Sequence, residues 1–264
     1  MKRTLWIGMA IWLACSVNST WAVDIEGFLS QGRQYEQQQQ WTEAFSMYSE
    51  ALKYEPNNAT VHYLLGRVNE RLGSIESAVK SYQEAIRLSP GMPEAQQALE
   101  AYYLNRGIGF RRNNQSDEAL RAFQQVLTFN PNSIAAHFEL GQEFEQRKQL
   151  AEAAKAYQDT VALDADHSAA HSRLANVYST EGRYDDAVKE FQEVLRLNER
   201  DAEAYHGLGV AYSQLGQKEQ AIATLKQAIR FYLIAGHRDK AKPAYALQKK
   251  LEAEQFATQP GGKK

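Results

Sequence analysis

Apolar residues recur along this chain at intervals of 34 positions, lengthened once to 41, with polar and charged residues between them. One column of the pattern is an alanine: Ala44, Ala78, Ala119, Ala153, Ala187 and Ala221. Twelve positions before each alanine stands a small residue: Gly32, Gly66, Gly107, Gly141, Ala175 and Gly209. Four positions after it stands a large apolar one: Tyr48, Tyr82, Phe123, Tyr157, Phe191 and Leu225. A repeat of this length predicts a solenoid of stacked supersecondary units.

Each unit is predicted to be two helices joined by a short turn. Residues four positions apart share one face of a helix, which places the alanine and the large apolar residue together. The small residue on the first helix allows the second helix to approach closely. Proline ends the second helix of the first three units, at Pro56, Pro90 and Pro131, because it cannot continue the hydrogen-bond ladder. One such pair cannot cover its own apolar face, so each unit needs neighbours.

The combined register of glycine, alanine, aromatic residue and proline resembles the tetratricopeptide repeat (TPR) family, whose unit is a 34-residue helix–turn–helix. The resemblance covers residues 25–235. It implies an all-α fold, a right-handed superhelical solenoid of about six repeats with a C-terminal capping helix. The repeats are expected at residues 25–58, 59–92, 100–133, 134–167, 168–201 and 202–235.

Seven extra residues, 93–99, interrupt the regular spacing between the second and third repeats. Seven residues are nearly two helical turns, so such an insertion lengthens a helix with little rotation of its face. We expect a long helix from Pro93 through Tyr102 to about Asn105. The alternative is that the insert bends the stack.

The segment after the sixth repeat is predicted to close the solenoid. Ala235 and Gly236 are typical of a helix end. Residues 236–257 are expected to form a capping helix that turns Ala244, Leu247, Leu251 and Ala253 to one side. Residues 258–264 contain proline and glycine and are expected to be a disordered tail.

Residues 1–22 have the layout of a secretory signal peptide. A basic start, Lys2 and Arg3, is followed by an apolar run from Leu5 to Val17 and by Thr20-Trp21-Ala22, which offers small residues to a signal peptidase. The run is short for a membrane span. We therefore expect an exported, periplasmic protein, with an uncleaved N-terminal anchor as the alternative.

Cys15 is the only cysteine of the chain and lies within this leader. The sequence Leu13-Ala14-Cys15 partly resembles a bacterial lipoprotein box, although Trp12 stands where that pattern has an aliphatic residue. Two interpretations remain open at this point. Cys15 is either incidental to an apolar run or the lipid attachment site of a membrane-anchored lipoprotein.

The charge balance argues against nucleic acid as a partner. The chain has 30 basic and 32 acidic residues, a formal net charge of −2, and loss of the leader with Lys2 and Arg3 makes it −4. A nucleic-acid-binding protein is expected to carry a basic field instead. Contact with a membrane is expected only through the N-terminus.

Histidine is the residue type that most invites a metal or catalytic interpretation. His62, His137 and His171 all occupy the fourth position of a repeat, where Phe28, Tyr103 and Tyr205 stand elsewhere, so a packing role is favoured. His167 and His171 are spaced to share a metal, but no carboxylate or thiol obviously joins them. The sequence also lacks a phosphate loop, a nucleophile elbow and a zinc-protease motif. We expect no cofactor, no metal and no enzymatic activity.

The family resemblance implies a partner-binding groove lined by the first helix of each repeat. Carried onto this chain, the groove residues are Leu29, Arg33, Tyr63, Arg67, Arg71, Leu104, Arg111, Arg112, Phe138 and Gln142. An apolar stripe bordered by arginine fits a protein or peptide segment with apolar anchors and acidic groups. The alternative is that Leu29 and Leu104 pack under neighbouring helices and that the arginines pair with Glu36 and Glu70.

The resemblance therefore implies a non-catalytic scaffold or assembly factor of a bacterial cell envelope, which binds a peptide segment of its partner in the groove. Two alternatives stay open. One is a structural TPR protein that self-associates, and the other is a lipid-anchored outer-membrane TPR protein of pilus or secretion assembly.

Overall fold

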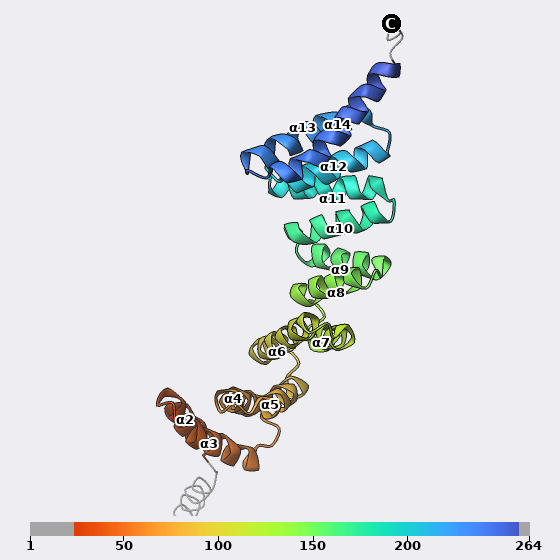
Figure 1. Cartoon of the computed structure of the whole chain (residues 1–264). Coiled ribbons are helices and arrows are strands. Elements are labelled where there is room, and N and C mark those ends of the chain that lie inside the picture. The colour runs from red at the N-terminus through yellow and green to blue at the C-terminus, as the bar shows by residue number, and fades with distance from the viewer. Residues whose placement is uncertain (1–23, 259–264) are drawn as a thin grey trace, which may run out of the picture. The chain divides into compact units, whose positions relative to one another are not determined.

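The computed structural model describes residues 24–258, which fold into helices only (Figure 1). Their bounds are α2 (Ile25–Gln37), α3 (Trp41–Tyr54), α4 (Ala59–Arg71), α5 (Ile75–Leu88), α6 (Pro93–Arg112), α7 (Ser116–Phe129), α8 (Ile134–Gln146), α9 (Leu150–Leu163), α10 (Ser168–Thr180), α11 (Tyr184–Leu197), α12 (Ala202–Gln214), α13 (Lys218–Ile234) and α14 (Arg238–Thr258). Successive helices pack in pairs, α2 on α3, α4 on α5, α8 on α9, α10 on α11 and α12 on α13, and α6 meets α7 where the Phe123 ring lies against Gly107. This arrangement confirms the predicted all-α solenoid.

The chain divides into two compact units, one ending at Ala101 and the other beginning at Tyr102. The division falls within α6, the helix that carries the seven extra residues. We describe each unit by itself, and the continuity of the stack from one unit to the next stays a prediction of the sequence.

The insertion lengthens a first helix without changing where it starts. The first helices of the other repeats all have 13 residues, whereas α6 has 20. Its start keeps the regular register, because Gln96 Nε2 donates a 2.9 Å hydrogen bond to the Pro90 carbonyl, just as His62 Nε2 lies 2.9 Å from the carbonyl of Pro56. The expected end near Asn105 is wrong. The helix continues to Arg112 because the extra residues add to the first helix of repeat three rather than replace part of it.

The turn inside each repeat uses one left-handed residue at the fifteenth position. Glycine fills that position in repeats two, five and six, whereas Gln39 (φ 59°), Asn114 (φ 58°) and Lys148 (φ 61°) fill it in the others. The next amide then donates back to the carbonyl five residues earlier, as from Gln149 to Phe144 (2.9 Å). This closure satisfies carbonyls at the end of the first helix and reverses the chain.

The glycine column marks the close approach of the two helices in a repeat. A Cβ atom added at Gly141 would lie 2.5 Å from the ring of Tyr157, and the same ring position meets Gly66 and Gly107 in their repeats. Repeat five differs, because Ala175 stands in the column and the Phe191 ring lies instead against Gly207 of α12. The rings of Tyr48, Phe123, Tyr157 and Phe191 are accordingly almost fully buried.

The C-terminal end departs from the repeat pattern. α13 has 17 residues against 14 in the other second helices, and it ends before the left-handed Gly236 (φ 77°). α14 then packs on α13 through Ala241, Ala244 and Leu251. Ala253, which the sequence places on the same face, is exposed.

Residues 1–23 and 259–264 lie outside the described part of the chain. The predicted signal peptide, Cys15 and most of the predicted tail therefore fall beyond it, while Thr258 is the last residue of α14. Between residues 24 and 258, no helix combines the length and the apolar character that a membrane crossing requires.

Candidate functional site

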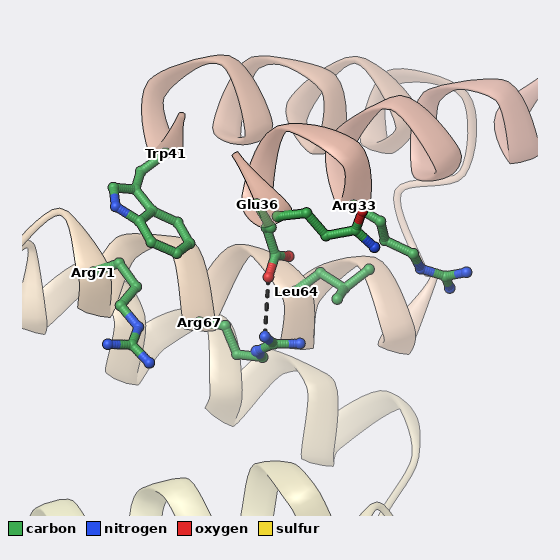
Figure 2. Close-up of a pocket in the computed structure, with 7 residues that line it drawn as sticks. Arg33, Glu36, Trp41, Leu64, Arg67 and Arg71 are labelled. Atoms are coloured by element: carbon green, nitrogen blue, oxygen red, sulfur yellow. Dashed lines mark ion pairs between the residues drawn. The ribbon is translucent and has the colours of Figure 1, made fainter. Parts of the chain in front are cut away.

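The first unit contains a pocket of about 370 Å³ between α2, α4 and the start of α3 (Figure 2). It is lined by Arg33, Glu36, Gln37, Trp41, Leu64, Arg67 and Arg71. Counted from the first residue of each repeat, the contributions of α2 are positions 9, 12 and 13, and those of α4 are positions 6, 9 and 13. The pocket therefore belongs to the face formed by the first helices of repeats one and two. We call it the arginine pocket.

Positive charge predominates in the arginine pocket. Arg67 Nη2 lies 2.9 Å from Oε2 of Glu36, the only carboxylate among its lining residues. Arg71 lies over the ring of Trp41, 5.7 Å from the ring centroid. Arg33 is exposed and forms no ion pair with any described side chain. Three guanidinium groups thus face one carboxylate and one indole, an arrangement suited to an acidic group with an apolar neighbour.

Tyr48 of the core positions the side chain of Glu36. The hydroxyl of Tyr48 donates a 2.7 Å hydrogen bond to Glu36 Oε1, while the other oxygen of this carboxylate faces Arg67. Burial, followed by this hydrogen bond, raises the pKa of Tyr48 well above its usual value. The tyrosine consequently stays a donor over the whole physiological pH range.

The second unit has a pocket of about 240 Å³ on the equivalent face. It is lined by Arg111, Gln142, Glu145, Gln146 and Arg173. Gln142, Glu145 and Gln146 occupy positions 9, 12 and 13 of repeat four, and Arg173 occupies position 6 of repeat five. The same positions line the arginine pocket, so the repeat geometry itself produces a hollow between successive first helices.

The arginines of this second pocket are neutralised. Arg111 Nη2 lies 2.6 Å from Glu139 Oε2, and Arg173 Nη1 lies 3.4 Å from Glu145 Oε1. The arginine pocket keeps an excess of cations, whereas here each arginine faces a carboxylate. The two hollows share their lining positions and differ in charge, and the first one is the better candidate for an acidic partner.

The structure brings half of the predicted groove residues to these two pockets. Arg33, Arg67 and Arg71 line the first pocket, and Arg111 and Gln142 line the second. Exposed Arg112, at the end of α6, lines neither of them.

The predicted apolar stripe needs correction. Leu29 is only 4% exposed and belongs to the core of the first unit, because α2 turns it toward Tyr48 and Val61. Leu104 is partly buried against the core cluster that contains Phe123. Both leucines therefore pack under neighbouring helices instead of lining an open groove. Arg67 likewise pairs with Glu36 rather than standing free beside such a stripe.

The two predicted aromatic groove residues are half-buried and packed against the core tyrosines. Tyr63 lies 5.9 Å from Tyr82 between ring centroids, and Phe138 lies 5.7 Å from Tyr157. Phe138 also contacts the ring of His167 at 4.9 Å. Their packing against the core therefore leaves only part of each side chain exposed.

Sequence reasoning missed Trp41, Leu64 and Arg173, which occupy positions 17 and 6, from which the resemblance supplied no groove residue. It also missed Gln37, Glu145 and Gln146, because from positions 12 and 13 the prediction took only arginines. A tryptophan at the start of a second helix, where the other repeats have smaller or more flexible residues, was a signal that could have identified Trp41.

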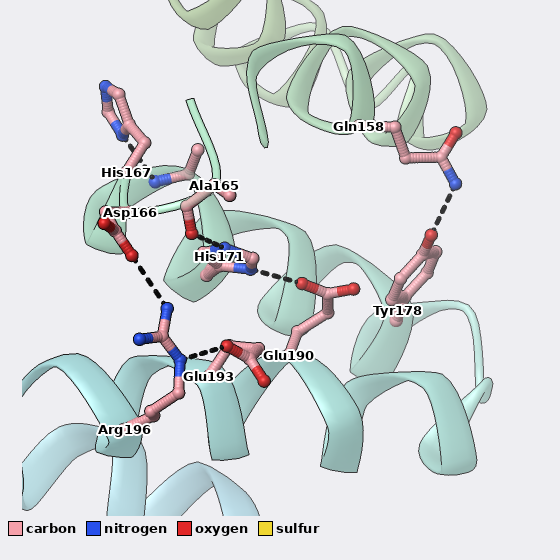
Figure 3. A network of polar contacts seen from close by, with 10 residues as sticks. Gln158, Ala165, Asp166, His167, His171, Tyr178, Glu190, Glu193 and Arg196 are labelled. Carbon is pink, nitrogen blue, oxygen red and sulfur yellow. Dashed lines mark hydrogen bonds and ion pairs between the residues drawn. The ribbon is translucent and has the colours of Figure 1, made fainter. Parts of the chain in front are cut away.

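His137, His167 and His171 have structural partners, and Figure 3 shows those of His167 and His171. The Nε2 atoms of His137 and His171 lie 3.0 and 3.1 Å from the carbonyl oxygens of Pro131 and Ala165 in the preceding turns. His171 Nδ1 also lies 2.6 Å from Glu190 Oε2, and His167 Nδ1 accepts a hydrogen bond from the Ala170 amide at 3.1 Å. Across the described residues, no group of three His, Cys, Asp or Glu side chains is placed to hold a metal ion.

Comparison with known proteins agrees with this architecture. A family model described as tetratricopeptide repeat matches residues 166–233, and a second with the same description matches residues 29–93 and 104–168. The chain belongs to the tetratricopeptide repeat family. The TPR fold is a non-catalytic protein-interaction fold, and TPR proteins generally act as protein-interaction scaffolds. No curated protein sequence gives a significant match to this TPR chain.

Several solved TPR structures resemble the chain. YrrB, described as a TPR protein with an unusual peptide-binding site, shares 20% identity and a TM-score of 0.51 over 74% of this chain and 97% of its own. A complex of the TPR2AB domain of yeast Sti1 with pHSP90 shares 14% identity and a TM-score of 0.43 over 86% of this chain and 98% of its own. The structure of pilF of Pseudomonas aeruginosa shares 16% identity and a TM-score of 0.45 over 83% of this chain and 96% of its own. At 20% identity, the likeness to YrrB shows the fold alone.

Proposed function

We propose that this TPR protein is a non-catalytic scaffold or assembly factor of the bacterial cell envelope, which binds an acidic peptide segment of its partner at the arginine pocket. The excess of arginine over carboxylate in that pocket is the observation that carries the proposal. The segment places acidic groups beside Arg33 and beside Arg71, which lie on either side of the Glu36–Arg67 ion pair, and an apolar side chain against Trp41 and Leu64.

The chemistry of the lining residues supports this choice. Arginine forms paired hydrogen bonds with carboxylates, and arginine and tryptophan are the residue types most enriched at binding hot spots. All three arginines are exposed, but Arg67 is already paired with Glu36, whereas Arg33 and Arg71 form no ion pair with a described side chain. These two can therefore engage a partner without breaking an existing ion pair.

The envelope location rests on the leader-like residues 1–22. Export is tested by fusing residues 1–30 to an enzyme that is active only after translocation. Activity of the fusion supports the proposed location. An inactive but intact fusion removes the envelope from the proposal and leaves peptide binding untouched.

The binding site is tested with the double variant Arg33→Ala/Arg71→Ala. Partners are captured from an envelope extract by chemical crosslinking and identified, and the affinity of the identified segment is then measured by fluorescence anisotropy. We expect the double variant to weaken binding by at least about tenfold, since each charge-assisted bond contributes roughly 1.5–3 kcal/mol.

Arg200→Ala/Lys250→Ala is the matched control, because it removes the same charge from exposed positions outside the pocket. It is expected to bind like the unchanged protein at equal ionic strength. If both double variants lose affinity equally, general charge attraction accounts for binding and the arginine pocket is not the site.

A further inference from the structure

The second unit carries a pair of pockets on a different face, lined by both helices of repeats three and four. One, of about 240 Å³, is lined by Tyr103, Arg106, Phe110, Glu118, Arg121, Ala122 and Gln125. The other, of about 440 Å³, is lined by Leu127, His137, Leu140, Phe144, Ala151, Glu152, Lys155, Ala156 and Asp159. Seven positions of the repeat, 4, 7, 11, 19, 22, 23 and 26, are common to both. None of these residues lines either of the pockets between first helices.

A small residue at position 23 opens both pockets. That residue is Ala122 in repeat three and Ala156 in repeat four, and each is only 6% exposed, at the floor of its pocket. Phe110 and Phe144, at position 11, supply a partly buried aromatic surface beside them. The pocket of repeat four is thus a mainly apolar depression, whereas that of repeat three combines an apolar floor with polar and charged side chains in similar measure.

Repeat five shows what a larger residue does at this position. Glu190 stands there, and its Oε2 atom lies 2.6 Å from His171 Nδ1, at position 4 of the same repeat (Figure 3). The carboxylate therefore reaches across the space that Ala156 leaves beside His137. In repeat four that space stays open, with His137 Nδ1 still 3.9 Å from Asp159.

Charge differs between the two pockets. Arg106 and Arg121 outnumber Glu118 at the first, where Arg106 is positioned by a 2.9 Å hydrogen bond to the Tyr102 hydroxyl and lies 5.3 Å from the Phe110 ring centroid. At the second, Lys155 pairs with Asp159 at 2.7 Å, which leaves Glu152 as the uncompensated charge. A matching ligand is acidic beside the first pocket and basic beside the second.

We propose that α6–α9 form a second protein-binding surface, which takes two apolar side chains of one partner segment into these pockets, with an acidic residue beside Arg121 and a basic residue beside Glu152. Apolar depressions with a few polar groups at the rim are the usual form of such anchor sites. This surface goes beyond the arginine pocket and allows the scaffold to hold a second protein segment at the same time.

Ala156→Glu tests the surface, because it introduces at position 23 of repeat four the glutamate that repeat five has at that position. The new carboxylate is expected to meet His137 as Glu190 meets His171, so the pocket fills while the fold is retained. The probe is a fluorescein-labelled helical peptide with two leucines about seven residues apart, two helical turns, with glutamates around one and lysines around the other. We expect anisotropy to show binding to the full chain and a loss of at least about tenfold in Ala156→Glu.

Two further variants distinguish binding at this surface from binding at the arginine pocket. Arg121→Glu is expected to weaken peptide binding about tenfold at low salt, and Arg33→Ala/Arg71→Ala is expected to leave it unchanged. A peptide with serine in place of both leucines is expected not to bind. Circular dichroism and the melting temperature check that each variant is folded.

Three results would overturn the proposal. The first is equal peptide affinity of folded Ala156→Glu and the unchanged chain. The second is loss of peptide binding in Arg33→Ala/Arg71→Ala, which would assign the peptide to the arginine pocket. The third is a chain that dimerises at micromolar concentration and becomes monomeric as Ala156→Glu, because the occupant would then be a second copy of the protein.

Discussion

The Tyr157 hydroxyl donates a 2.8 Å hydrogen bond to Oε2 of Glu145, twelve residues earlier, and Oε1 of the same carboxylate accepts from Arg173 of the next repeat at 3.4 Å. Glu145 therefore ties both helices of repeat four to the first helix of repeat five. Glu36 does the same with Tyr48 and Arg67 in the first unit. These relays connect the buried core of the repeats to the face that carries the candidate site.

Replacing Tyr157 by phenylalanine is expected to lower the free energy of unfolding by about 1 kcal/mol, the usual net value of one hydrogen bond. Urea denaturation of the full chain measures this free energy. Tyr245→Phe is the matched control, because Tyr245 is 53% exposed. Removing its hydroxyl group is expected to change the free energy of unfolding little. Equal losses for the two variants would mean that the Glu145 relay does not stabilise the fold.

Alkaline pH is expected to destabilise the protein through the same tyrosines. Burial, followed by hydrogen bonds to Glu36, Glu70 and Glu145, raises the pKa of Tyr48, Tyr82 and Tyr157 in the folded state. Below the unfolded pKa of about 10 both states are protonated and the full stability is present. Above it the unfolded state loses protons first, so stability falls as pH rises.

The triple variant Tyr48→Phe/Tyr82→Phe/Tyr157→Phe tests whether these tyrosines cause the loss of stability at alkaline pH. Its free energy of unfolding is expected to fall less steeply between about pH 9.5 and 11 than that of the unchanged chain. Parallel slopes for the two proteins would contradict the prediction.

Acidic pH is expected to destabilise the protein through protonation of His206 in the unfolded state. Burial lowers the pKa of His206, whose ring lies 6.3 Å from that of Tyr232. The folded state then binds a proton less readily than the unfolded state. The contribution to stability is present above the unfolded pKa of about 6.5 and is lost as pH falls below it. Thermal denaturation of His206→Gln is expected to show a smaller drop in melting temperature between neutral and acidic pH, and an unchanged drop would exclude His206 as the cause.

Gly141→Ala is expected to be destabilising by roughly 1–3 kcal/mol, because its Cβ atom would lie 2.5 Å from the Tyr157 ring. Gly109→Ala is the matched control within a first helix, since an added Cβ there meets nothing within 4 Å. That change is expected to stabilise by up to about 1 kcal/mol through helix propensity. Guanidinium denaturation of both variants gives the comparison, and a shift of the same sign in both would refute a close approach of the two helices at Gly141.

Lys148→Gly is expected to stabilise the protein by about 1 kcal/mol. Lys148 has a left-handed backbone (φ 61°), which disfavours residues that carry a Cβ atom. The reverse change, Gly182→Lys, places a lysine at the equivalent turn (φ 76°) and is expected to destabilise by a similar amount. A melting temperature that falls in Lys148→Gly would show that another interaction of the lysine outweighs the backbone strain.

Local periodicity made the helix pairs predictable. The 34-residue column of alanine with an aromatic residue four positions later depends on helical geometry alone, so the number and order of the helices up to α13 could be read from it. The end of α6 at Arg112 also lies in that register, because Arg112 is position 13 of repeat three, where the first helices of the other repeats end. The spacing left open whether residues 93–99 lengthen this helix or bend the stack, and in the structure they belong to α6.

The candidate site was predictable only in part, since its residues come from different helices. Arg33, Arg67 and Arg71 were placed on one face by their repeat positions, and the structure joins them in one pocket. The charge of the pocket depends on which carboxylates reach which arginines. That selection distinguishes the cationic first pocket from the neutralised one around Arg173.

The sequence by itself determined the repeat, its helix–turn–helix unit and the packing role of the glycine column, because these follow from spacing along one chain. The tertiary structure decided the burial of Leu29, the place of Arg33 in a cationic pocket and the difference between Ala156 and Glu190 at one repeat position. Each of these depends on the distance between side chains of separate helices. A one-dimensional register fixes which face a residue occupies but not which neighbour it meets there.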